Sequence, residues 1–223
     1  MDLIMAITIP ARASAILLLT GLVLGGSAVA RAQEVDCAAV QGSATPIEMR
    51  YHRTNGALVI IQSDRASHDN FTVWSRTETP QGVIVSRSTF VGGLMSESQD
   101  TTNFGGTIRT YHKTYAFEGL PGDFDRKSDI DYKIIITTRM QDGSTTKSVV
   151  LQKYRFKYAS TRKVGPCELV IVHATAEVEI PPSPVKNHIA QVYLPELNLG
   201  AGDPIEPTIE GVTTSFVPIT PLQ

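Results

Sequence analysis

The sequence predicts an all-β fold, an antiparallel β-sandwich of about eight strands. From Cys37 to Ile180, apolar and polar residues alternate with a period of two, which is typical of strands that bury one face. Turn-forming residues separate these runs, and no stretch between residues 37 and 180 keeps a helical period. Because hairpin-connected strands also build closed β-barrels, a barrel is the alternative.

The composition predicts one globular domain. The chain has 223 residues, of which 42% are hydrophobic, and this is enough for one core. Its 20 Lys and Arg residues nearly balance its 22 Asp and Glu residues. Because phosphate binding requires a concentrated positive field, we do not expect nucleic acid as a partner.

The first 32 residues are predicted to be a signal peptide. The apolar run at residues 15–24 has the length of a signal h-region and is too short to span a bilayer. The A-x-A sequence at residues 30–32 predicts cleavage before Gln33, with an uncleaved anchor as the alternative. We expect an exported protein, periplasmic in a bacterium or extracellular, that is not membrane-integral after cleavage. The chain then divides into a signal peptide (1–32), a β domain (33–180) and a Pro-rich C-terminal tail (181–223).

The first two strands are predicted to form a hairpin. Ile47, Met49 and Tyr51 alternate with polar residues, so one face of this strand is expected inside. Asn55-Gly56 follows, and this dipeptide is the strongest short signal for a tight β-turn. The apolar run at residues 58–61 then predicts a second strand that is buried on both faces.

The same alternation predicts six further strands, with Pro, Gly and Asp at the turns between them. They are expected at residues 71–78, 83–91, 107–118, 130–140, 145–158 and 167–180. In the last of them, Val172 and Ala174 share one face and His173 lies on the other. Residues 92–106 carry glycine pairs at both ends and no strand pattern, which predicts a loop, either an ordinary connection or a flap over a ligand pocket.

The two cysteines, Cys37 and Cys167, are predicted to form a disulfide. An exported protein enters an oxidising compartment, where an isolated pair of cysteines is usually bonded. For a loop of more than a hundred residues, the chain-entropy model gives an upper figure of about 5 kcal/mol of stabilisation. Two free thiols, or bonds to another chain, are the alternatives.

The C-terminal tail is expected to be extended. Pro181-Pro182-Ser183-Pro184 ends the last predicted strand, because proline cannot donate to a β ladder. Two apolar clusters follow, at residues 189–199 and 212–219, and the second is expected to add to a sheet edge. Such a tail should rest on its own domain or on a neighbour, so we expect a protein partner or self-association through it.

A group of cations is the most distinctive local feature. Lys153, Arg155 and Lys157 share one face of a predicted strand, and Lys147 precedes them. We call these four residues the cationic ridge. It is a candidate site for an anionic partner or for the tail, whose acids are Glu196, Asp203, Glu206 and Glu210. The alternative is a solvated face that protects the sheet from edge-to-edge aggregation.

Four acids, Asp123, Asp125, Asp129 and Asp131, are spaced like the start of a calcium loop. Lys127 occupies a ligand position and the obligatory glycine and closing Glu are missing, so an EF-hand is excluded. An irregular Ca²⁺ site is a weak alternative to a polar turn. No other cofactor is expected, since the sequence contains no catalytic, phosphate-binding or metal-binding motif.

These observations favour an interaction or structural protein of the cell envelope or the extracellular space. A barrel-type carrier of a small apolar or lipid ligand is the second hypothesis, and a hydrolase is the third. A filled core would favour the interaction protein, and a pocket would favour the carrier. The residues expected to line such a pocket are Phe71, Val73, Ile134, Ile136 and Phe156.

Overall fold

The structure is a computed structural model that describes residues 37–41, 46–65, 70–121, 124–164 and 167–222. The predicted signal peptide lies outside these residues. The described residues form one short helix, α1 (Cys37–Gln41), one 3-10 turn, η1 (Pro195–Leu197), and twelve strands. The strands are β1 (Ile47–His52), β2 (Leu58–Ser63), β3 (Phe71–Thr79), β4 (Gly82–Val91), β5 (Leu94–Phe104), β6 (Thr107–Glu118), β7 (Ile130–Met140), β8 (Thr145–Val164), β9 (Cys167–Glu179), β10 (Lys186–Leu194), β11 (Leu199–Asp203) and β12 (Thr208–Thr213).

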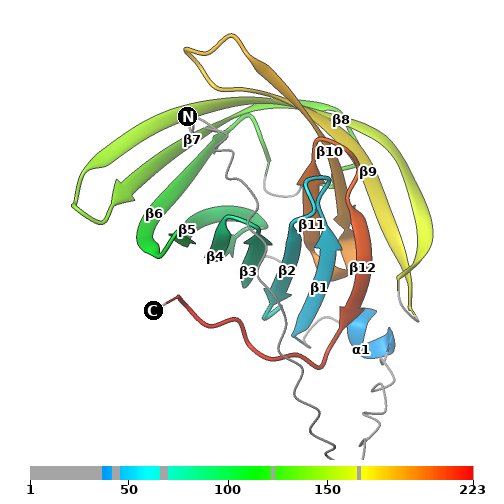
Figure 1. The fold of residues 1–223 in the computed structure, drawn as a ribbon. Helices are drawn as coiled ribbons and strands as arrows, with labels where there is room; N and C mark the ends of the chain where they lie inside the picture. Colours follow the sequence, from blue (N-terminus) through cyan, green and yellow to red (C-terminus); the bar gives the residue numbers. More distant parts are fainter. Residues whose placement is uncertain (1–36, 42–45, 66–69, 122–123, 165–166, 223) are drawn as a thin grey trace, which may run out of the picture. The chain divides into compact units, whose positions relative to one another are not determined.

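All twelve strands belong to one antiparallel sheet, with the order β11-β10-β9-β8-β7-β6-β5-β4-β3-β2-β1-β12 (Figure 1). Strands that follow each other in the sequence are neighbours from β1 to β11, and β12 returns to pair with β1. Within the described part of the chain β11 and β12 do not pair, so the sheet is open. The all-β prediction is confirmed, whereas a closed barrel is not formed and the strands number twelve rather than eight.

The register reveals that the sheet is rolled over itself. Side chains that pair directly across neighbouring strands lie on the same face of a sheet. When these pairs are followed from Met49 through every strand, Ala176 of β9 lies on the same face as Met49. Ile171 is an odd number of positions from Ala176 and therefore lies on the opposite face. Even so, Met49 and Ile171 are buried in the same core.

The two ends of the sheet therefore overlap. The face of β1, β2 and β12 that carries Met49 packs on the reverse face of β9, β10 and β11. Figure 1 shows β9, β10 and β11 behind β1 and β12. The prediction of two separate sheets is not confirmed, because one rolled sheet supplies both layers of this core. We call the face that carries Met49 the inner face.

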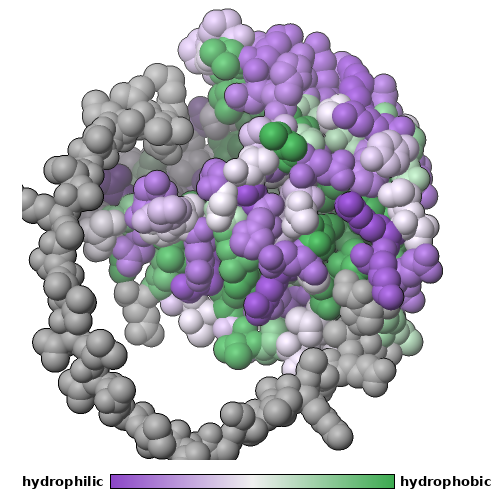
Figure 2. Space-filling view, turned by 45° about the vertical axis from the view of Figure 1, so that its right-hand side comes forward, coloured by the Kyte–Doolittle hydropathy of each residue, from purple (hydrophilic) through white to green (hydrophobic). Residues whose placement is uncertain are grey.

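The core between the overlapping ends is filled. Ile47, Leu169 and Leu194 have no exposed surface (0%), and Val40 of α1 packs beside them. The disulfide between Cys37 and Cys167 joins α1 to the first residue of β9, as the sequence predicts. On the face drawn in Figure 2, hydrophilic side chains predominate and hydrophobic ones occupy smaller areas.

The prediction of an extended tail is wrong for residues 186–213, which form β10, β11 and β12. The prolines after β9 end that strand as predicted, but the Ser183 N–H donates to the Ile180 carbonyl at 3.1 Å. This turn leads the chain back along β9. Pro204 and Pro207 stand between β11 and β12, outside the ladder. The prolines therefore mark connections between strands, not an exit from the sheet.

The prediction of a loop at residues 92–106 is also wrong, because β5 occupies most of it. The two glycine pairs form the hairpin turns on either side of β5, with φ between 57° and 81°. Two-residue turns of this kind match the twist of the strands, and glycine adopts them without a steric cost. The strand was missed because both of its faces are polar, with Ser98 and Asp100 on one face and Gln99 on the other.

The last described residues, 214–222, cross the outer face of β2. Gln62 holds them there, because its Nε2 donates to the Val217 carbonyl at 2.7 Å and its Oε1 accepts from the Ile219 N–H at 2.8 Å. The predicted addition of residues 212–219 to a sheet edge is therefore formed only at its start, where β12 pairs with β1.

Candidate ligand-binding pocket

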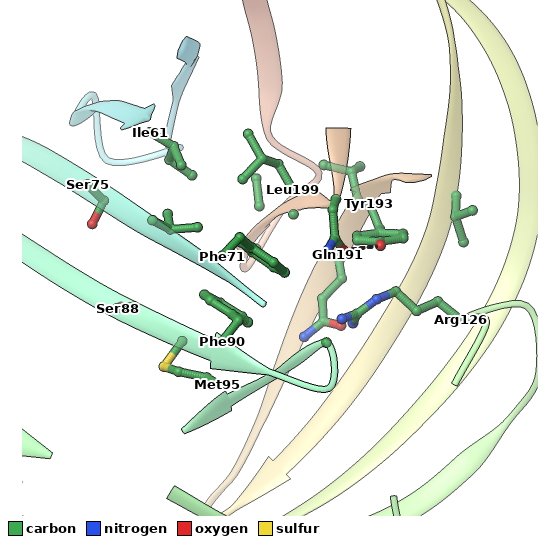
Figure 3. A pocket seen from close by; sticks show the side chains of 18 of the residues that line it. Ile61, Phe71, Ser75, Ser88, Phe90, Met95, Arg126, Gln191, Tyr193 and Leu199 are labelled. Atoms are coloured by element: carbon green, nitrogen blue, oxygen red, sulfur yellow. Dashed lines mark hydrogen bonds between the residues drawn. The ribbon is translucent and has the colours of Figure 1, made fainter. Parts of the chain in front are cut away.

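Beside the filled core, the rolled sheet forms a half-open pocket of about 420 Å³ (Figure 3). Strands β3, β4 and β5 form one wall, and β8 to β11 contribute to the other. The pocket exists because the end of the sheet at β9 and β10 turns its inner face toward the inner face of β3 and β4. A volume of this size is typical of sites that hold a small molecule.

One wall of the pocket is aromatic and aliphatic. Phe71 and Phe90 are cross-strand partners whose rings stack with centroids 4.5 Å apart and planes 9° apart. Met95 pairs with Phe90 on the next strand. Figure 3 shows these three side chains on the same side of the pocket. The stack offers a rigid apolar surface to a ligand.

The facing wall contains small residues in β11 that leave room beside β10. Gly202 is the partner of Gln191, and Gly200 is the partner of Tyr193, and all four residues line the pocket. A Cβ at Gly202 would lie 3.2 Å from Ile189 Cγ2. Any side chain at this position would therefore crowd β10 and reduce the space in the pocket.

Arg126 supplies the charge of the pocket. Its guanidinium carbon lies 4.3 Å from the centroid of the Tyr193 ring, which is a cation–π contact. Its backbone carbonyl accepts a hydrogen bond from Tyr154 Oη at 2.7 Å, which fastens the connection between β6 and β7 to β8. Arg126 forms no ion pair with any carboxylate of the described residues. Figure 3 shows its side chain and that of Gln191 reaching the same part of the pocket.

The tyrosines near Arg126 do not compensate its charge. Burial raises the pKa of Tyr154 to about 12, although the charge of Arg126 acts in the opposite direction. Burial also raises the pKa of Tyr132 to about 12, again against the effect of Arg126. Both phenols are therefore neutral at ordinary pH, and the guanidinium charge is available to a ligand.

A second hollow, of about 660 Å³, lies at the ends of β6, β7 and β8. Apart from Met140 and Gly143, its lining is polar and includes His112 and Arg139. Solvent reaches most of these side chains from outside. The pocket at Arg126 is the better candidate because it combines an apolar wall with a charged group.

The pocket contains two of the five residues expected from the sequence, Phe71 and Val73. Ile134, Ile136 and Phe156 are not part of its lining. Sequence reasoning missed the polar end of the pocket, because Arg126 lies in the predicted calcium loop and Gln191 and Tyr193 lie in the predicted tail. No local pattern joins these segments.

Two of the four residues of the cationic ridge, Lys153 and Arg155, are paired with acids. Lys153 lies 3.3 Å from Glu177 Oε1, and Arg155 binds Asp131 at 2.6 Å and approaches Asp129 at 3.8 Å. Lys147 and Lys157 are exposed. This arrangement favours the alternative interpretation of the ridge as a solvated, charge-balanced face.

The acids of the predicted calcium loop have other partners. Asp129 Oδ1 accepts a hydrogen bond from the Phe156 N–H at 2.9 Å, and Asp125 Oδ1 accepts one from the Lys127 N–H at 2.8 Å. Asp131 is bound to Arg155, and Asp123 lies outside the described residues. Among the described residues, no group of three His, Cys, Asp or Glu side chains is arranged to hold a metal ion.

The predicted contact between the tail acids and the ridge is not formed in the described chain. Asp203 accepts hydrogen bonds from the N–H and Oγ of Thr54, each at 2.6 Å, in the turn between β1 and β2. Glu210 lies 2.8 Å from His52 Nε2, and Glu196 accepts from a backbone N–H of β9 at 3.1 Å. Through these hydrogen bonds and ion pairs, the acids connect the C-terminal strands to the core instead.

Ser160, His173 and Glu206 form a cluster that sequence reasoning also missed. Ser160 Oγ lies 3.0 Å from His173 Nε2, and Glu206 Oε2 lies 3.2 Å from His173 Nδ1, although this second contact lacks hydrogen-bond geometry. His173 is buried and stacks on Tyr158. The residues come from β8, β9 and the β11–β12 connection, so no sequence spacing predicts their meeting. Neither hollow described above is lined by them.

The chain has no match among protein-family models, curated proteins or solved structures. In the part of the chain that the structure describes, no helix has the length and apolarity needed to cross a membrane. The pocket is therefore the feature of the molecule from which a function can be inferred.

Proposed function

We propose that this protein binds and carries a small apolar ligand in the pocket between β3–β5 and β9–β11. One observation carries the proposal. Beside a filled core, the rolled sheet leaves a pocket of about 420 Å³ with an aromatic wall. A half-open pocket with such a wall offers apolar surface to a small molecule that enters from solvent.

The overlapping ends of the sheet support a carrier over a purely structural protein. The core at Leu169 and Ile47 is filled, and the pocket residues outside that core, Phe90, Met95 and Arg126 among them, are available for binding. The disulfide is compatible with an oxidising, extracytoplasmic compartment, where the predicted signal peptide would direct the chain. An apolar molecule crossing such an aqueous compartment needs a protein that covers it.

Binding of N-phenyl-1-naphthylamine, a neutral apolar fluorophore, tests the proposal. The mature protein should give a saturable rise in fluorescence. Ser75→Phe places a ring in the pocket, since Ser75 lies on the inner face of β3 and lines the pocket, and should weaken binding about tenfold or more. Thr77→Phe is the matched control, on the same strand and face but outside the lining, and should bind as the natural protein does.

Fluorescence that does not saturate, or that both variants reduce equally, would contradict the proposal. Native mass spectrometry of protein purified from its own host provides an independent test. A retained small molecule, absent from the Ser75→Phe variant, is the expected result.

The cluster of Ser160, His173 and Glu206 supports a second candidate function, an esterase. Ser160 Oγ would bond to the ester carbonyl carbon, His173 Nε2 would take the serine proton, and the alcohol would leave with that proton. Water, deprotonated by His173, would then cleave the acyl–serine bond, which releases the acid and returns the proton to Ser160. This candidate ranks second because Glu206 is not aligned to orient the imidazole. Covalent labelling by a fluorophosphonate, lost in Ser160→Ala and retained in Ser148→Ala on the same strand, would support it, and equal labelling would exclude it.

A further inference from the structure

The pocket has two chemically different ends. Phe71, Phe90 and Met95 form the apolar end, and Arg126 and Gln191 form the polar end on the opposite side (Figure 3). Among the described residues that line the pocket, Arg126 is the one charged side chain. A ligand that fills the pocket must therefore satisfy a cation at one end and apolar surface at the other.

The position of Arg126 makes an anion the suitable partner for the polar end. The side chain is half-buried, its guanidinium rests on the Tyr193 ring, and the described residues supply no carboxylate to pair with it. A cation that is partly removed from water gains from an anionic partner more than an exposed one does. The planar guanidinium can donate two parallel hydrogen bonds to a carboxylate, and the Gln191 amide adds a further donor.

A second cation on the inner face does not compete for this role. Lys113 of β6 pairs with Ser98, the partner of the pocket residue Ser88, but its Nζ is bound to Asp100 at 2.5 Å. Burial acts to lower the pKa of Lys113, but the hydrogen bond and charge of Asp100 outweigh it and hold the pKa above its ordinary value. The charge of Lys113 is thus satisfied within the protein, while that of Arg126 is not.

We propose that the ligand is an amphiphilic anion, an aliphatic chain with a carboxylate head, held with its head at Arg126 and Gln191 and its chain against Phe71 and Phe90. This inference rests on the proposed function and adds the chemical class of the ligand. It assigns Arg126 the role of selecting an acid over a neutral molecule of the same length.

Displacement of N-phenyl-1-naphthylamine by dodecanoate and by dodecanol, both below the micellar range, tests the inference. Dodecanoate should displace the fluorophore at about a tenfold lower concentration than dodecanol. In Arg126→Gln the affinity for dodecanoate should fall about tenfold more than the affinity for dodecanol, so that this difference disappears. Arg87→Gln is the matched control, because Arg87 also rests on an aromatic ring, Trp74, but on the outer face.

The outcomes separate the two proposals. Equal displacement by dodecanoate and dodecanol would overturn the carboxylate inference and leave the carrier function standing. Absence of saturable fluorophore binding would overturn the carrier function itself. A dodecanoate preference that persists in Arg126→Gln, or that Arg87→Gln also removes, would overturn the role of Arg126. Dodecyl phosphate that binds about tenfold more tightly than dodecanoate would overturn the assignment of the head group as a carboxylate.

Discussion

The overlapping ends of the sheet and its middle strands differ in how completely their side chains are buried. Where β1, β2 and β12 lie over β9, β10 and β11, strands are covered on both sides, and residues such as Ile47 and Leu169 are 0% exposed. From β5 to β7 the sheet is a single layer, and Phe104 and Ile108 beside the β5–β6 turn are 41% and 38% exposed. The same strand geometry therefore gives a filled core in one region and accessible surface in the other.

The disulfide and the long-range hydrogen bonds are also distributed unequally between these two regions. The disulfide, the hydrogen bonds of Asp203 to Thr54 and those of Gln62 to residues 217 and 219 all join distant segments near the overlapping ends. The middle strands are joined chiefly by hairpins between sequence neighbours. The pocket lies where the two regions meet, because β9 to β11 of one wall belong to the overlap and β5 of the other wall belongs to the single layer.

Truncation of a core residue should have the largest effect on stability. Leu169→Ala leaves a cavity between the overlapping ends and should lower the free energy of unfolding by about 3 to 5 kcal/mol. Ile134→Ala in β7, where the side chain is half-buried, should cost about 1 kcal/mol. Urea denaturation followed by circular dichroism compares them. Equal losses at both positions would show that the single layer is as important to stability as the overlap.

Removal of the disulfide should have the next largest effect. Replacing both Cys37 and Cys167 by Ser frees a loop of 130 positions and should cost about 2 to 4 kcal/mol. Fluorophore binding should be retained, because neither cysteine lines the pocket. Thiol titration of the denatured, unreduced natural protein should find no free sulfhydryl group, and two free groups would contradict the bond.

Asp203 should make the overlap sensitive to acid. Burial acts to raise the pKa of Asp203, but hydrogen bonds from Thr54 and Arg53 outweigh it and hold the pKa below its ordinary value. The carboxylate therefore stabilises the fold above the unfolded pKa of about 4, and this contribution is lost as the pH falls through the folded pKa.

Asp203→Asn tests this dependence. At pH 7 the variant should be about 2 kcal/mol less stable than the natural protein, since hydrogen bonds to a charged group are lost. Below pH 4 the two should converge when unfolding by urea is measured across the acid range. A constant difference down to pH 2 would exclude Asp203 as the acid-sensitive group.

Loss of the Gln62 contacts should have the most local effect. Gln62→Met removes both hydrogen bonds to the segment 214–222 and the one that Gln62 Nε2 donates to the buried carboxylate of Glu48, and together these losses should cost about 2 kcal/mol. Limited proteolysis should then cleave after β12 sooner than in the natural protein. Gln99→Met on exposed β5 is the matched control, and the same acceleration in this control would show that the Gln62 contacts do not protect the segment.

Most strands with one apolar face were predictable from sequence to within a residue or two, but β8 continues to Val164, six residues past its predicted end at residue 158. β6 and β7 begin and end where the alternation predicts, at residues 107–118 and 130–140. The hairpin at Asn55-Gly56 is confirmed, with a φ of 79° at Gly56. β5 was missed because its own residues are polar on both faces, and β10 and β11 were missed because their bounding prolines resemble the start of a tail.

The pocket was less accessible to sequence reasoning than the strands. Phe71 and Val73 were expected to line it because alternation identifies the inner side of β3. Arg126, Gln191 and Tyr193 carry no pattern that relates them, since their meeting depends on how far the sheet turns between β7 and β10. Charge along the chain was also misleading, because Asp203 and Glu210 bind partners near β1 instead of the ridge.

β9 shows which properties of a strand follow from local sequence pattern and which depend on long-range packing. Its alternation identifies a strand, and the pair of cysteines identifies the bond at its start, because period and redox chemistry are local or pairwise properties. The alternation assigns Ile171 and His173 to a less buried face, yet the structure leaves them 1% and 4% exposed. That burial arises because β1, β2 and β12 return to cover the reverse face of β9. Which faces of the two sheet ends pack together depends on the twist accumulated over the whole sheet. No short stretch of sequence determines that total twist.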